Sequence, residues 1–110
     1  MSSKDLWTGL ACLKANPEVN NFRRFGNGRG AFVHLVACVE SKEQLMHLVE
    51  KRAEELDCVL LELEDVQLLE SRMSNPDYPE ELITMCETAT RQPEDTVFGT
   101  FNVWLHDESN

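Results

Sequence analysis

Hydrophobic and polar positions in the middle of the chain follow three successive patterns. From Ala31 to Val39 nearly every residue is apolar, which predicts a strand buried on at least one face. After Asp57 apolar and acidic residues alternate, which predicts a second strand with one polar face. The apolar side holds Val59, Leu61 and Leu63, and the acidic side holds Glu62 and Glu64.

The stretch between these two strands has the period of a helix. Its apolar residues recur three or four positions apart, at Leu45, Leu48, Val49, Ala53 and Leu56. Ser41 and Gln44 have the spacing of a capping box, in which each side chain accepts a hydrogen bond from a backbone amide at the start of a helix. The unit is therefore strand, helix, strand, and its two strands run parallel if they share a sheet.

Three more elements flank this unit. Residues 6–13 alternate loosely, which fits a strand, with a short helix as the alternative. Residues 79–92 combine Pro79 in a first helical turn with an apolar stripe. Residues 96–106 form the most regular alternation in the chain. We expect Phe101 and Val103 on one face of that strand and Phe98, Thr100, Asn102, Trp104 and His106 on the other.

These elements predict a single α+β domain over residues 1–110, with sequence order β-β-α-β-α-β and a four-stranded mixed sheet. Two helices are expected on one face of that sheet. The covered face would hold Val33, Leu35, Leu61, Leu63, Phe101 and Val103. The uncovered face would hold Phe32, His34, Val36, Glu62, Glu64, Phe98, Thr100, Asn102, Trp104 and His106.

The uncovered face predicted here is rich in aromatic and branched residues. A solvent-exposed apolar patch of this kind is typical of association or ligand binding. We therefore expect a non-catalytic interaction protein that forms a homo-oligomer, most simply a dimer, through this face. The alternative is a small-ligand binder or minor enzyme, in which Glu62 or Glu64 makes His34 or His106 a stronger base.

Charge adds a second expectation about partners. The chain has 20 acidic and 10 basic side chains, a formal net charge of -10. Such a field repels nucleic acid and anionic lipid and speeds encounter with a basic protein. We expect a possible basic protein partner, no nucleic acid and no membrane.

Cysteine placement gives no sign of a disulfide framework or a metal site. Cys12, Cys38, Cys58 and Cys86 are widely separated, and no close-set pair of cysteine or histidine ligands occurs. The start of the chain lacks the apolar stretch of a signal peptide. We expect free thiols, a cytoplasmic location and no cofactor.

One glycine-rich stretch resembles a phosphate-binding loop only in composition. Residues 26–30 combine three glycines with Arg29, but they lead into a strand and are not followed by a helix. A hairpin connection is the better interpretation, because glycine and asparagine suit such turns.

In its small size, acidity and lone α+β sheet, the chain is similar to two loose groups of proteins. One is the immunity proteins that neutralise toxins, and the other is the orphan proteins of mobile gene cassettes. The resemblance lies in architecture over the whole chain. It implies a binding role and assigns no functional residue.

Overall fold

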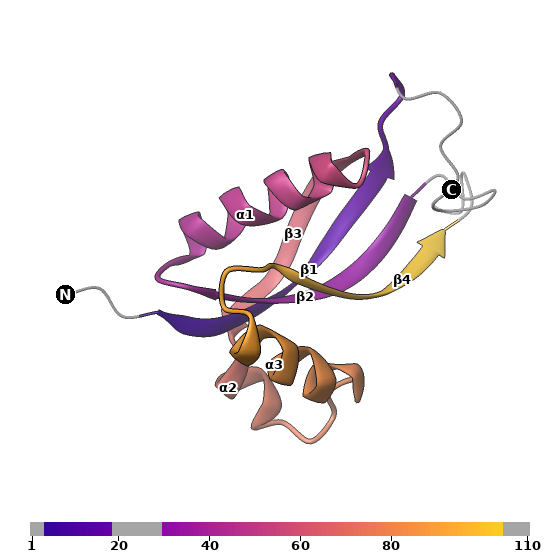
Figure 1. The fold of residues 1–110 in the computed structure, drawn as a ribbon. Helices are drawn as coiled ribbons and strands as arrows, with labels where there is room; N and C mark the ends of the chain where they lie inside the picture. The colour runs from indigo at the N-terminus through magenta and orange to yellow at the C-terminus, as the bar shows by residue number, and fades with distance from the viewer. Residues whose placement is uncertain (1–3, 19–29, 105–110) are drawn as a thin grey trace.

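The computed structural model describes residues 4–18 and 30–104 of the chain (Figure 1). The elements in order are β1 (Asp5–Ala15), β2 (Gly30–Val39), α1 (Lys42–Glu55), β3 (Cys58–Leu68), α2 (Leu69–Met73), α3 (Glu81–Arg91) and β4 (Val97–Trp104). The α+β class is confirmed. The short helix α2 is an addition to the two helices that were expected. Residues 26–29 of the glycine-rich stretch and His106 lie outside the described residues.

All strand pairs in the sheet are antiparallel, so the expected mixed sheet is wrong. The strand order is β3-β1-β2-β4. β2 and β3 do run in the same direction, as a strand, helix, strand unit requires, but β1 lies between them and is antiparallel to both. No parallel strands are therefore neighbours in the described sheet.

The helices cover both faces of the sheet, not one as expected. Figure 1 shows α1 against one face and α2 and α3 on the opposite side. Alternate residues of β2, including Val33 and Leu35, are fully buried in a cluster with the α1 residues Leu45 and Val49. Val36 points the other way and is fully buried in a second cluster beneath α3. Because β2 is apolar on both sides, each side can bury a helix.

Bulges in β3 and β4 change which residues share a face. In β3, Leu61 is an extra residue between two paired positions and is 48% exposed, so its expected place beneath a helix is wrong. In β4, Leu35 and Val33 pair with Phe98 and Phe101, which are three residues apart. Phe98 therefore packs on the α1 side with Phe101, not on the opposite side. Val103, expected beneath a helix, is 42% exposed.

Helix α1 begins as its capping pattern predicts. The Ser41 hydroxyl accepts a hydrogen bond from the Gln44 amide at 3.2 Å. The Gln44 carboxamide oxygen accepts from the backbone amide of Glu40 at 2.7 Å, one residue earlier than in a standard capping box. These bonds fix the helix start two residues after β2 ends.

Candidate functional site

Helix α3 covers only part of its side of the sheet, and the remainder forms the candidate site. We call this remainder the open face, and it consists of Leu10, Cys12, Phe32, His34, Glu62, Glu64, Asn102 and Trp104. One row crosses all four strands, because Glu62 pairs with Cys12, Cys12 with Phe32, and Phe32 with Asn102. Paired side chains on one face lie about 5 Å apart, so this row is continuous.

Six of the ten residues predicted for this face occupy it, and four do not. Val36 lies on the same side but is buried beneath α3. Phe98 lies on the α1 side, Thr100 lies within the β4 bulge, and His106 is outside the described residues. The rest, together with Leu10 and Cys12, form a connected surface.

Two carboxylates lie side by side at the β3 edge of the open face. Glu62 and Glu64 are two residues apart on one side of the strand, and both are exposed. Repulsion from Glu62 raises the pKa of Glu64 above its ordinary range, and desolvation and Asp65 add to the rise. A positive charge placed between the two carboxylates would remove this repulsion.

The Cys12 thiol lies next to these carboxylates in the same row. Partial burial raises the pKa of Cys12, and the charges of Glu62 and Glu64 raise it further. The Trp104 side chain beside the thiol acts in the opposite direction. Cys12 is therefore protonated at neutral pH and unsuited to act as a nucleophile.

The Trp104 ring packs closely against a glycine at the end of the open face. A Cβ atom on Gly30 would lie 2.3 Å from Cζ2 of Trp104 and 2.4 Å from the Leu13 carbonyl oxygen. Only glycine therefore fits at position 30. The indole Nε1 of Trp104 is buried and makes no well-formed hydrogen bond among the described residues.

His34 is held by a carboxylate that the sequence analysis did not select. Its Nδ1 lies 3.4 Å from Oε2 of Glu81, at the start of α3, and both side chains are 26% exposed. The other carboxylate oxygen of Glu81 accepts a hydrogen bond from the backbone amide of Thr100 at 2.8 Å. Glu81 thus joins α3 to β2 and β4.

The expected cluster of His34 with the glutamates of β3 does not form. In the register, Leu10 lies between His34 and Glu64, so His34 and Glu64 are two strands apart, or about 10 Å. Among the described residues, no ion pair within 4 Å joins His34 to a glutamate of β3. His34 is a neighbour of Glu81 instead.

The sequence analysis missed Cys12 and Glu81 for different reasons. Only the register places Cys12 beside Glu62. The contact of Glu81 with Thr100 depends on the β4 bulge. Alternation in a single strand shows neither relationship.

Within residues 4–18 and 30–104, no group of three or more histidine, cysteine, aspartate or glutamate side chains is arranged to hold a metal ion. No helix in the same ranges has the length and apolar character needed to cross a membrane. No family model matches the chain, and no curated protein or solved structure shows significant similarity to it.

Proposed function

We propose that this chain is a non-catalytic interaction protein and that its open face binds a basic segment of a partner protein. The observation that supports this most directly is that the exposed pair Glu62 and Glu64 shares one face with Phe32, which is 38% exposed and is separated from Glu62 by Cys12. Exposed aromatic surface bordered by charge is typical of protein contact sites.

Charge favours a basic partner as the occupant. Lysine or arginine side chains of a partner would relieve the repulsion that raises the pKa of Glu64. The net charge of -10 would also steer a basic protein toward the chain. A second copy carries the same net charge, which opposes close approach.

Both edges of the sheet are poorly suited to pairing with another strand, which favours the face as the contact surface. β3 has two bulges, one of which includes Asp65 in a left-handed conformation with φ of 55°. β4 has a bulge at which the Thr100 amide already donates to Glu81. Bulged edges resist strand addition because their amides and carbonyls are out of register.

Self-association through the open face is the second candidate. The exposed Phe32 ring favours it, because burying apolar area against a second copy contributes about 25 cal/mol per Å². Asn102 also lies on this face and is exposed and uncharged. The two candidates therefore share one surface and differ in the occupant.

The test compares two double variants with the same net charge. Glu62→Gln/Glu64→Gln removes the acidic pair, and Glu43→Gln/Glu50→Gln removes two exposed charges from α1. Calorimetric titration uses a short lysine- and arginine-rich peptide that contains phenylalanine. The β3 variant should bind about two- to thirtyfold more weakly than wild type, since two exposed ion pairs contribute about 0.2–1 kcal/mol each.

The α1 variant should bind the peptide almost as tightly as wild type. Equal weakening by both double variants would show that only the overall field attracts the peptide, and would overturn the proposal. Sedimentation of the wild type as a dimer that Phe32→Asp converts to monomer would also overturn it, in favour of self-association.

A further inference from the structure

A cleft lies on the α1 side of the sheet, away from the open face. Helix α1 packs mainly against β3, with fewer contacts to β2 and β1, and no described helix covers β4 on this side. The space between α1 and β4 forms a cleft of about 530 Å³. This volume is within the range of small-molecule sites, about 300–1,000 Å³.

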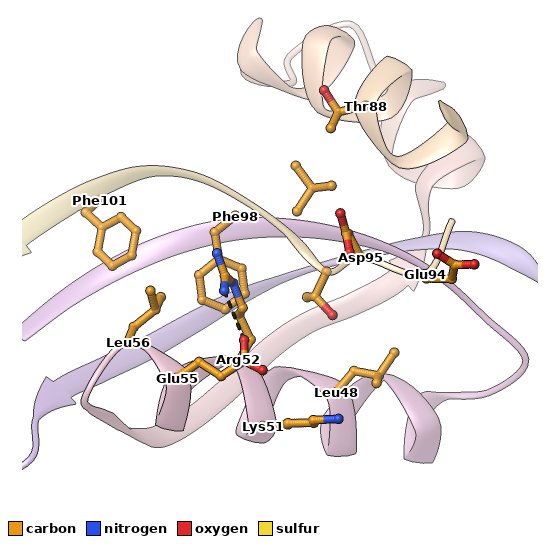
Figure 2. Close-up of a pocket in the computed structure, with 12 residues that line it drawn as sticks. Leu48, Lys51, Arg52, Glu55, Leu56, Thr88, Glu94, Asp95, Phe98 and Phe101 are labelled. Atoms are coloured by element: carbon orange, nitrogen blue, oxygen red, sulfur yellow. Dashed lines mark hydrogen bonds and ion pairs between the residues drawn. The ribbon is translucent and has the colours of Figure 1, made fainter. Parts of the chain in front are cut away.

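The floor of the cleft is apolar and partly aromatic. Leu48 and Leu56 of α1 face Phe98 and Phe101 of β4 (Figure 2). The two phenylalanine rings have centroids 6.2 Å apart and are inclined at 50°. A flat or branched apolar group could pack between these rings and the leucines.

The two walls of the cleft have opposite charges. Lys51, Arg52 and Glu55 line it from α1 and leave that wall with one net positive charge, whereas Glu94 and Asp95 line it from the segment between α3 and β4. Figure 2 shows Arg52 extending from α1 toward the sheet, with Asp95 on the other side of the cleft. Among the described residues, no ion pair within 4 Å joins the two walls.

Arg52 retains hydrogen-bond donors that can reach a ligand. One guanidinium nitrogen, Nη1, donates to Oε1 of Glu55 at 3.0 Å on the same helix. A guanidinium has five N–H donors, so several remain for a carboxylate. Asp95 is exposed, and among the described residues its carboxylate accepts no side-chain hydrogen bond and forms no ion pair within 4 Å.

We propose that this cleft binds a small zwitterion with an apolar body, of the amino-acid or dipeptide class. The ligand carboxylate would bind Arg52, its ammonium group would bind Asp95, and its apolar body would lie against Phe98 and Phe101. Opposite charges on facing walls select a molecule that carries both charges over one that carries either alone. This inference does not depend on the proposed function of the open face.

The experiment titrates the protein with phenylalanyl-alanine and follows backbone amides by NMR at low ionic strength. Two matched ligands each lack one charge: the N-acetylated dipeptide and the dipeptide amide. The free dipeptide should shift the amides of residues 48–56 and 94–101 together. Each blocked ligand should bind about two- to fivefold more weakly, as expected for loss of one exposed ion pair.

Variants assign each charge to its wall. Arg52→Gln should make the protein bind the free dipeptide and the dipeptide amide equally well. Glu55→Gln also breaks the Arg52–Glu55 pair but keeps Arg52, so this variant should still bind the free dipeptide more tightly than the amide. Asp95→Asn should remove the preference for the free ammonium group, and Glu50→Gln, which removes an exposed acid outside the cleft, is its matched control.

Three results would overturn the proposal. One is equal affinity for the free and both blocked dipeptides, which would mean that the walls do not recognise charge. Another is a loss of binding in Glu55→Gln as large as that in Arg52→Gln. The last is the absence of shifts around the cleft at millimolar dipeptide, which would mean that the cleft does not bind this class.

Discussion

The Glu81 carboxylate accepts a hydrogen bond at 2.8 Å from the backbone amide of Thr100. This bond joins the first turn of α3 to the bulge in β4, and it marks where α3 stops covering the sheet. The other carboxylate oxygen lies 3.4 Å from His34. Glu81 thus ties the start of α3 to both strands at the border of the open face.

We predict that Glu81→Ala lowers the free energy of unfolding by about 1–2 kcal/mol, the lower part of the range for a hydrogen bond to a charged group, because the site is partly exposed. Urea unfolding measures this change. Glu80→Ala removes the neighbouring exposed acid, which makes no side-chain capping bond, and should cost only a few tenths of a kcal/mol. Equal losses in the two variants would contradict the assigned bond.

Gly99 gives a second test of the same contact. A Cβ atom on Gly99 would lie 2.8 Å from Oε1 of Glu81, so Gly99→Ala should displace the carboxylate from the Thr100 amide. The substitution should therefore cost less stability in a Glu81→Ala background than in wild type. Additive losses in the double-mutant cycle would show that Gly99 and Glu81 do not interact.

Gly30 should tolerate no side chain. Gly30→Ala brings a Cβ atom within 2.4 Å of both the Trp104 ring and the Leu13 carbonyl, and backbone atoms cannot move aside easily. Overpacking a core typically costs about 1–3 kcal/mol, and we expect this substitution to lower the free energy of unfolding by at least the upper end of that range. Gly9→Ala, whose nearest contact would be a leucine methyl at 3.2 Å, should be milder. Thermal unfolding of Gly30→Ala at the wild-type temperature would refute this packing.

Val49 should be essential to the α1 cluster. It is fully buried, so Val49→Asp places an unpaired charge in the core at a cost comparable with the about 5–15 kcal/mol that stabilises a domain. Met46 is on the same helix and is 39% exposed, so Met46→Asp should leave the protein folded. Circular dichroism should show no cooperative melt for the first variant and a near-native melt for the second.

The Glu62–Glu64 pair predicts a specific pH dependence. The pKa of Glu64 is higher in the folded protein than in the unfolded chain. At pH values between these two pKa values, the folded protein therefore binds more protons than the unfolded chain. The contribution of Glu64 to stability therefore falls as pH rises through its raised pKa. Carboxyl NMR should show that Glu62→Gln lowers the pKa of Glu64, while Glu43→Gln leaves it unchanged. An unchanged pKa in Glu62→Gln would exclude repulsion as the cause.

Some of the fold was predictable because local signals agreed with tertiary packing. The apolar run from Ala31 to Val39 and the cap at Ser41 predicted β2 and α1, and both are confirmed. The same run also contained the reason for the main error. Val36 is apolar on the side opposite Val33, which allowed α3 to pack on the second face.

The candidate site was predicted in part. Phe32, Asn102 and Trp104 were placed on the correct face, whereas Phe98 was not, because a bulge reverses the alternation partway along β4. The one sequence sign of this bulge was Gly99, an isolated glycine inside the strand pattern. The separation of His34 from Glu64 depends on β1 lying between their strands, which no single strand can show.

If the open face, and not the acidic surface as a whole, contacts a basic partner, NMR titration of the wild type with the lysine- and arginine-rich peptide should show it. We expect the amides of Leu10, Cys12, Phe32, Glu62 and Glu64 to shift together. The amides of exposed acidic residues on α1, such as Glu43 and Glu50, should not shift. Shifts confined to α1, or spread evenly over both surfaces, would contradict the proposed contact.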